Sequence, residues 1–362
     1  MKICEYSPIR YLTFFIIVSF TALLVSKSQE TPTPQLAAKE AEAAAAEASQ
    51  AVDATEKAPS LTNEQLNAVV TITGDTGCGT GFVSVVKGKP CIITNQHVLV
   101  GQSKLVITNA SGITFRGNGF IAAKNADIAL ITLEKIPDGV IPLSIAEKAN
   151  ELAQLNDSTN IPGNSKGDGV ITVTPGKVIA FGPQKIEISN PVFAGNSGSP
   201  IIHSKSGKVI GVLTEATLIK LTAFDKAAQA NPNSQIKSEI RYFGHRIDMV
   251  TGWETLDWKK FSETSEAIKE GWAQIEAACY LLADNPKWKE NQKLVEIIDK
   301  ANLGRAKITG ITLLNLKNVI KQSYQEPIQR ASRLQHYYIH KDDITRLQAA
   351  DQEVSAAFTP IK

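Results

Sequence analysis

The sequence has no excess of charge of either sign. Its 362 residues include 38 Lys and Arg and 36 Asp and Glu, which leaves a formal net charge of +2 at pH 7. Because the two signs are nearly balanced, the net charge gives no indication of a nucleic-acid or membrane-surface partner. No internal repeat is evident. With 43% hydrophobic and 20% charged residues, the composition is that of a globular protein long enough for two domains.

A hydrophobic run long enough for a typical membrane span is also missing. The N-terminus carries Lys2, Arg10 and then an uncharged apolar run from Tyr11 to Val25. That run is shorter than the roughly 20 residues of a spanning helix, and the layout is typical of an export signal. We therefore predict a cleaved signal peptide over residues 1–28, with a membrane anchor formed by the same apolar run as the alternative. In either case we expect the protein to be exported, to the periplasm or out of the cell.

Cysteine is scarce, with four residues in the chain. Cys4 precedes the apolar run, which is the wrong place for a lipid-modified cysteine. Cys78 and Cys91 flank a predicted hairpin, and an exported compartment would permit a disulfide bond between them. A turn at Lys87-Gly88-Lys89 would put residue 78 opposite a position well beyond residue 91, so the sequence leaves this pairing open. Cys279 is expected to be a small buried hydrophobic residue.

Composition divides the remaining chain into a linker, a β region and a helical region. Residues 29–60 are rich in Ala and Glu, have little to bury and lack a heptad pattern, so we expect a linker. Residues 61–257 contain short β-like runs separated by turn signals such as Pro175-Gly176, which predicts a mainly β domain with two barrels. The expected strands are Ala68–Thr73, Gly81–Val86, Cys91–Thr94, Leu105–Thr108, Phe120–Ala123, Ile128–Leu133, Val170–Thr174, Lys177–Phe181, Ile186–Ser189, Val209–Thr214 and Ile240–Ile247.

Residues 258–362 change to a helical period. Apolar residues from Phe261 to Leu282 recur at spacings of three, four and seven, which predicts a helix with Ser262 as its N-cap. Asn285-Pro286 predicts a break, followed by a second helix that ends near Gly304. Beyond residue 312 the composition remains helical. Interruptions are expected there at Pro327 and at Lys341-Asp342-Asp343.

Three polar residues of the β region form a candidate site. His97 follows an apolar strand, Asp127 opens another, and Ser197 lies between glycines that let the backbone bend and aim N–H groups at one point. Each has an ordinary structural interpretation alone: a packing histidine, a buried hydrogen-bonded acid and a polar turn. Together they favour acyl transfer, because a histidine can take the serine proton and an aspartate can hold that histidine in the required tautomer.

The order of these motifs resembles that of trypsin-like (chymotrypsin-fold) serine peptidases, most strongly the bacterial HtrA/Deg branch. The resemblance covers residues 64–250 and implies two antiparallel six-stranded β-barrels with the active site in the cleft between them. The motifs that carry it are Cys78-Gly79-Thr80-Gly81-Phe82, Ile92-Ile93-Thr94-Asn95-Gln96-His97-Val98, Asp127-Ile128-Ala129-Leu130 and Gly195-Asn196-Ser197-Gly198-Ser199-Pro200.

The resemblance also implies a role for each site residue. It implies that His97 is the general base, Asp127 the acid that orients it and Ser197 the nucleophile. The backbone N–H groups of Gly195 and Ser197 would form the oxyanion hole. Thr214, Glu215 and Ala216 would form the strand that binds the substrate, and the Thr214 hydroxyl would support Asp127.

The sequence departs from the family pattern at several positions. Asn196 replaces the aspartate that pairs with a newly cut N-terminal ammonium, so activation by N-terminal cleavage is not expected. The position six residues before Ser197 is Pro191 and not an acid, so no preference for Lys or Arg at the cleavage site is indicated. Leu213 stands where glutamyl endopeptidases of this fold carry a histidine, so no preference for Glu is indicated either. A helical region follows the β domain where the HtrA branch usually carries a PDZ domain.

The sequence therefore predicts an exported serine endopeptidase that acts on polypeptides, with unfolded envelope proteins as candidate substrates. No metal or organic cofactor is expected. His336 and His340 lack a convincing third ligand, although Asp342 and Asp343 lie close by. The rival hypothesis is a non-catalytic binding or chaperone module that uses a protease-like barrel to present the helical region.

Overall fold

The computed structural model describes residues 61–220, 238–282, 325–334 and 336–358. The predicted signal peptide, the linker and the second helix of the C-terminal region lie outside these ranges. The chain divides after Leu256 into two compact units, which we describe separately. Within the described ranges, no helix has the length and apolar character needed to cross a membrane.

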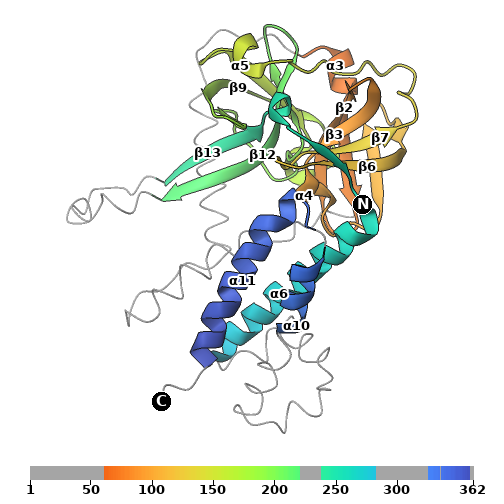
Figure 1. Cartoon of the computed structure of the whole chain (residues 1–362). Helices are drawn as coiled ribbons and strands as arrows, with labels where there is room; N and C mark the ends of the chain where they lie inside the picture. Colours follow the sequence, from red (N-terminus) through yellow and green to blue (C-terminus); the bar gives the residue numbers. More distant parts are fainter. Residues whose placement is uncertain (1–60, 221–237, 283–324, 335, 359–362) are drawn as a thin grey trace, which may run out of the picture. The chain divides into compact units, whose positions relative to one another are not determined.

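The first half of unit 1 is an eight-stranded sheet, whose strands are drawn in orange and yellow in Figure 1, apart from the teal β14. Apolar residues of adjacent strands, such as Val69, Phe82 and Ile93, are fully buried and form its core. The strands, in sheet order, are β14 (Trp253–Thr255), β6 (Gly117–Ala123), β7 (Ala129–Leu133), β3 (Lys89–Thr94), β2 (Cys78–Val86), β1 (Val69–Gly74), β4 (Leu105–Asn109) and β5 (Thr114–Phe115), and two short helices, α3 (Asn63–Asn67) and α4 (Gln96–Leu99), accompany them.

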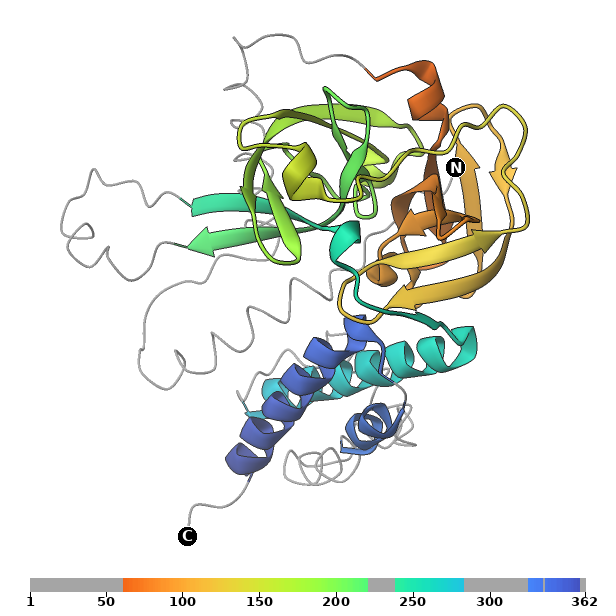
Figure 2. The same cartoon turned by 45° about the horizontal axis from the view of Figure 1, so that its top comes forward.

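The second half of unit 1 is a closed six-stranded barrel, and Figure 2 shows its green strands curving around a common core. Ile161, Val178, Ile186, Ile201 and Leu213 belong to that core. The strands, in barrel order, are β10 (Lys185–Ile188), β13 (Ser238–His245), β12 (Val209–Lys220), β11 (Pro200–His203), β8 (Ser158–Gly163) and β9 (Thr172–Phe181), with α5 (Ala149–Leu152) and the short helical turns η1 (Ser165–Gly167) and η2 (Ile247–Met249) beside them.

The mainly β class with a helical C-terminal region is confirmed. In place of a second six-stranded barrel, the first half forms an eight-stranded sheet, because β14 returns from the end of unit 1 to pair with β6 and the very short β5 extends β4. The turn expected at Pro175-Gly176 was wrong. Both residues continue strand β9 and pair with Asn160 and Thr159 of β8.

Two barrel strands were missed because their sequences do not resemble strands. Strand β8 contains polar residues together with Pro162 and Gly163, and β11 begins at Pro200. Both strands are almost entirely buried. Their pairing with β9 and β12 in the barrel outweighs their weak intrinsic preference for strand.

The described part of unit 2 contains α6 (Trp258–Leu282), α10 (Gln325–Arg333) and α11 (Tyr338–Phe358), drawn in cyan and blue in Figure 1. The N-cap predicted at Ser262 was wrong, because the helix begins four residues earlier. The Asp257 side chain accepts the Lys260 N–H at 3.2 Å, which is the hydrogen bond of an N-cap residue. Ser262 lies inside the helix.

The interruptions expected in the C-terminal helices were also wrong. Pro327 lies in the first turn of α10, where its missing N–H has little cost, and Lys341-Asp342-Asp343 lie within α11. Across the two helices, Phe261 of α6 packs edge-on against Tyr337, which precedes α11, with ring centres 5.6 Å apart. This aromatic contact forms the buried centre of the unit.

Neither C-terminal histidine belongs to a metal cluster in the described part of the chain. His340 Nε2 lies 3.0 Å from the Ser265 hydroxyl, and His336 Nε2 lies 2.7 Å from the Ala331 carbonyl. Both imidazoles therefore make hydrogen bonds within the helical unit.

The two cysteines of the β2–β3 hairpin are not bonded to each other. Cys91 is a free, buried cysteine, and burial raises the pKa of its thiol to about 12. Cys78 is disulfide-bonded, but not to Cys91. The hairpin register explains the difference, because Cys91 lies opposite Ser84, whereas Cys78 lies opposite Thr73 of β1.

Candidate active site

His97 and Asp127 come together because two neighbouring strands end and begin at the same edge. Thr94, the last residue of β3, pairs with Ala129, the first residue of β7. His97 follows β3 on the short helix α4, and Asp127 stands two residues before β7. The antiparallel ladder therefore fixes the separation of the two residues before any side chain is considered.

The Asp127 carboxylate binds His97 through both of its oxygens. Oδ2 lies 2.6 Å from His97 Nδ1, and Oδ1 accepts the His97 backbone N–H at 3.0 Å. Asp127 is only 4% exposed, and burial of a carboxylate without strong hydrogen bonds would be unfavourable. This double contact orients the imidazole with Nδ1 toward the acid and leaves Nε2 for proton transfer.

Two buried amides that the sequence reasoning did not assign support this pair. Gln96 donates to the carbonyls of Ala123 and Ala126 at 2.8 and 3.0 Å, on either side of the turn that precedes Asp127. Asn95 donates to the Asp127 carbonyl at 2.6 Å. Both amides are fully buried. Two consecutive polar residues directly after a buried strand were the sequence signal for them.

Ser197 lies in the loop between β10 and β11, whose bend depends on two glycines. Gly195 has φ +93° and Gly198 has φ +89°, in the left-handed region. A Cβ on Gly195 would lie 2.1 Å from the Asn164 carbonyl oxygen, and one on Gly198 would lie 2.0 Å from the Thr80 carbonyl oxygen. No other residue type fits at either position without displacing the backbone.

The loop is held against the strand ends that carry His97. The Thr80 N–H donates to the Ser197 carbonyl at 2.8 Å. A Cβ on Gly79 would lie 2.7 Å from the side chain of Val98 and 3.2 Å from the Ser197 carbonyl oxygen, so both residues border the same glycine. The hydroxyl of Ser197 makes no hydrogen bond to His97 within the described residues. Such bonds are often long in enzymes without substrate.

The backbone around Ser197 leaves two N–H groups available. Asn196 donates its N–H to the Phe193 carbonyl at 3.1 Å, and Gly198 donates to the Leu213 carbonyl at 2.9 Å. In the part of the chain that the structure describes, the N–H groups of Gly195 and Ser197 have no hydrogen-bond acceptor. An arrangement of this kind can bind an oxyanion.

Asn196 is buried directly beside the nucleophile position. Its Oδ1 accepts the Ser165 hydroxyl at 3.0 Å, and its Nδ2 has no partner among the described residues. A neutral amide that accepts from a neighbouring loop holds this segment without an ion pair.

Thr214, Glu215 and Ala216 lie on β12, which pairs with β13. The Thr214 hydroxyl donates to the Val212 carbonyl at 3.0 Å and accepts from Asn95 at 3.2 Å, so it reaches the Asp127 main chain through that amide. Glu215 forms an exposed ion pair with Lys185 at 2.6 Å.

His245 is a further titratable residue near the site that the sequence reasoning missed. It lies on β13 and is 2% exposed. Burial lowers its pKa, because the charged imidazolium is poorly solvated there, and the negative charge of Asp127 partly opposes this effect.

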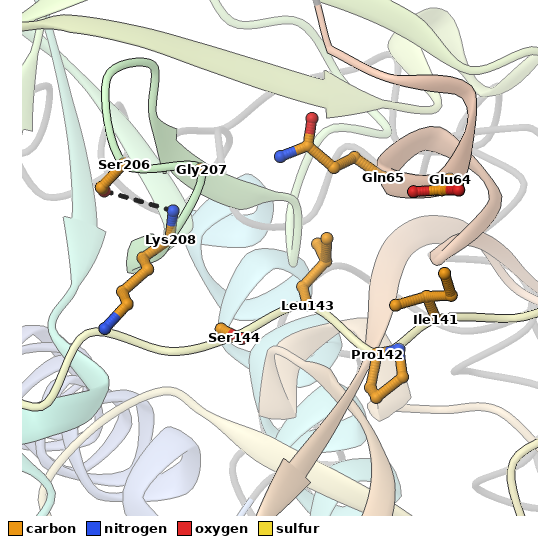
Figure 3. Close-up of a pocket in the computed structure, with 9 residues that line it drawn as sticks. All are labelled: Glu64, Gln65, Ile141, Pro142, Leu143, Ser144, Ser206, Gly207 and Lys208. Carbon is orange, nitrogen blue, oxygen red and sulfur yellow. Dashed lines mark hydrogen bonds between the residues drawn. The ribbon is translucent and has the colours of Figure 1, made fainter.

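A pocket of about 270 Å³ lies away from these residues. Figure 3 shows Glu64 and Gln65 of α3 facing the turn at Ser206 and Lys208 across it, with Leu143 between them. None of the candidate catalytic residues lines this pocket, so it is not part of the proposed active site.

Residues 79–212 match the family model of the trypsin-like peptidase domain, a stretch that includes His97, Asp127 and Ser197. Over this stretch the chain is therefore similar to the trypsin-like peptidase domain.

Two curated relatives are similar over part of their length. The putative serine protease HhoA of Synechocystis sp. is 32% identical over 150 residues, which are 38% of this chain and 36% of that protein. The probable periplasmic serine protease do/HhoA-like of Haemophilus influenzae is 30% identical over 148 residues, 38% of this chain and 30% of that protein. The chain thus spans about a third of the length of these relatives.

Among solved structures, the inactive form of the Rv3671c protease from M. tuberculosis is similar with a TM-score of 0.38 and 20% identity. The match covers 62% of this chain and 96% of that one.

Proposed function

We propose that the protein is a serine endopeptidase that hydrolyses peptide bonds through Ser197, His97 and Asp127. The observation that carries the proposal is that the buried Asp127 carboxylate forms hydrogen bonds with both the ring Nδ1 and the backbone N–H of His97. A histidine that served only for packing would not need its tautomer fixed by a buried acid. The free N–H groups of Gly195 and Ser197 support the same interpretation.

In the first step, the Ser197 hydroxyl oxygen attacks the scissile carbonyl carbon and its proton passes to His97 Nε2. The N–H groups of Gly195 and Ser197 stabilise the negative charge that forms on the carbonyl oxygen. The C–N bond then breaks, His97 returns the proton to the leaving amine, and an ester of Ser197 remains. Asp127 stabilises the transient imidazolium throughout.

In the second step, a water molecule attacks the ester carbonyl while His97 accepts one of its protons. The bond to Ser197 Oγ breaks, and the proton returns to that oxygen. The products are a free carboxylate, a free amine and the regenerated enzyme. The scheme requires no metal or organic cofactor.

The proposed substrates are polypeptides, with unfolded proteins of the cell envelope as candidates. The printed name of the Haemophilus influenzae relative describes a periplasmic protease. The apolar N-terminal run favours export of this chain as well. We propose that β12 binds the substrate backbone at Thr214, Glu215 and Ala216. This part of the strand lies next to the candidate site, because the Thr214 hydroxyl accepts from Asn95 and the Leu213 N–H donates to the Ser199 carbonyl.

A fluorophosphonate probe tests the proposal, because it labels only an activated serine. Wild-type protein should be labelled and should cleave a denatured protein, whereas Ser197→Ala should lose labelling and at least about 10⁴-fold in kcat. Ser144→Ala is the matched control, since Ser144 is exposed and lies on the segment between the two halves of unit 1. Wild-type protein that is neither labelled nor active would favour the rival binding module.

A further inference from the structure

We propose that the hydroxyl of Thr80 positions the oxyanion hole, by holding the Gly195 peptide and the neighbouring 164–167 segment from the opposite half of unit 1. The inference deepens the function proposed above and rests on it. Thr80 belongs to β2 of the first sheet, whereas Gly195 and Asn164 lie in loops between strands of the closed barrel. Thr80 does not touch the reacting atoms, so it is a positioning residue.

The polar groups of Thr80 are all engaged, and the side chain is 0% exposed. Its hydroxyl donates to the Gly195 carbonyl at 2.8 Å and accepts the Asn164 N–H at 2.9 Å. Its backbone N–H donates to the Ser197 carbonyl at 2.8 Å, and its carbonyl accepts the Thr94 hydroxyl at 2.7 Å. One residue thus connects the nucleophile loop with the strand that leads to His97.

The orientation of the Gly195 N–H follows from the peptide bond that precedes it. The Ala194 carbonyl accepts the Lys166 N–H at 2.7 Å. In a planar trans peptide the carbonyl and the N–H point in opposite directions, so the Gly195 N–H points away from Lys166. Rotation of this peptide would place a carbonyl where the oxyanion donor is needed.

Thr80 restrains the peptides on both sides of Gly195. Directly, its hydroxyl fixes the Gly195 carbonyl, which belongs to the following peptide, between Gly195 and Asn196. Indirectly, it holds the N–H of Asn164, at the start of the turn in which Gly167 donates to the Asn164 carbonyl at 3.0 Å. That turn presents the Lys166 N–H to Ala194, and Lys166 itself has φ +62°.

Removal of the hydroxyl would leave a buried carbonyl and a buried N–H unpaired. The least costly relief is rotation about Gly195, because glycine has the widest choice of backbone conformations. We therefore expect loss of the oxyanion donor without loss of the fold.

The test compares Thr80→Val, which keeps the shape but lacks the hydroxyl, with Thr80→Ser, which restores it. Ser84→Ala is the control, since Ser84 is buried on the same strand and donates to the Leu143 carbonyl at 2.7 Å, away from the loop. For each variant, kcat and KM are measured on a peptide substrate, together with Tm. Amide hydrogen exchange is measured over residues 190–200.

Thr80→Val should lower kcat by about 10–100-fold with KM changed less than about threefold, since loss of an oxyanion donor acts on the transition state. Exchange over residues 190–200 should become faster. Thr80→Ser should recover most of the activity, and Ser84→Ala should lower Tm without affecting kcat.

Unchanged kcat and unchanged exchange in Thr80→Val would overturn the inference, as would an equal loss of kcat in Ser84→Ala. The exchange measurement does not depend on activity. If wild-type protein proves inactive and is not labelled by the fluorophosphonate, the proposed function fails, while exchange still decides whether Thr80 holds the loop.

Discussion

The two halves of unit 1 supply the candidate site in different ways. The first sheet contributes His97 and Asp127 from the ends of two paired strands, where the ladder between Thr94 and Ala129 sets their positions. The closed barrel half contributes Ser197 and the proposed oxyanion donors from a loop, which is not part of a strand ladder. That loop depends on glycines with positive φ and on hydrogen bonds received from the first sheet.

The difference indicates where the site is vulnerable. An acid–base pair built on strand ends should tolerate changes in its surroundings but not in its own hydrogen bonds. A nucleophile loop built on glycine should be sensitive to any added side-chain atom. Three predictions separate these behaviours, beginning with the largest expected effect.

Asp127→Asn should reduce kcat by about 10⁴-fold. Both Asp127 oxygens accept N–H groups of His97, and an amide can present an acceptor to only one of them. The imidazole would then lose its orientation or its tautomer. Activity on a peptide substrate measures the loss, with near-UV circular dichroism as the check on folding. A folded Asp127→Asn variant within tenfold of wild-type kcat would show that the pair does not set the activity.

Gly195→Ala should reduce kcat by about 10²–10³-fold, comparable with loss of an oxyanion donor. The new Cβ would lie 2.1 Å from a carbonyl oxygen of Asn164, so the loop must move. Gly88→Ala is the matched control, because Gly88 also has a positive φ of +75° but has nothing within 4 Å of its Cβ position.

The control variant should lose about 1 kcal/mol of stability from backbone strain and keep its activity. Thermal unfolding and kcat are measured for both variants. If Gly195→Ala lost no more activity than Gly88→Ala, close packing of the loop against residue 164 would be irrelevant to function.

His245→Gln should make unfolding less dependent on pH below about 6.5. Burial lowers the pKa of His245 in the folded protein, so between the folded and unfolded pKa values only the unfolded chain binds the proton. Stability is therefore lost as the pH falls below about 6.5, by at most about 1.4 kcal/mol per pH unit from this residue. At neutral pH and above the group has no such effect.

Denaturant unfolding of both proteins between pH 7.5 and 5 measures this difference in slope. Parallel curves for wild type and His245→Gln would show that another group carries the acid sensitivity. His245 bears on both halves of unit 1, because it lies on a strand of the barrel and interacts electrostatically with Asp127 and His97 of the first half.

The candidate site was largely predictable from sequence because its motifs are local. His97 follows the apolar strand predicted at Cys91–Thr94, and Asp127 directly precedes the strand predicted at Ile128–Leu133, and these positions helped to select both residues. The supporting roles of Thr80, Asn95 and Gln96 were not predictable, since their partners lie far along the chain. Thr80 and Gly195, for example, are separated by 115 positions.

The fold was predicted less evenly. Most strands with alternating or continuous apolar residues were predicted within a few residues of their observed ends, whereas β12 continues to Lys220, well beyond the end predicted at Thr214. The polar strand β8 and the strand through Pro175-Gly176 were not, because pairing on both sides selects their conformation. The N-cap was misplaced for a local reason, because Asp257, and not Ser262, accepts the N–H of a residue in the first turn, Lys260.

The sequence by itself determined the class of the domain, the acid–base and nucleophile candidates, and the glycines that allow the loop to bend. These properties depend on residue type and on short spacings, which the chain carries locally. Tertiary structure alone decided that the Asp127 carboxylate binds His97 twice, and that a threonine on the first sheet holds the peptide of Gly195. Hydrogen bonds between distant segments need both partners brought together, and only the packing of the sheet against the barrel does that.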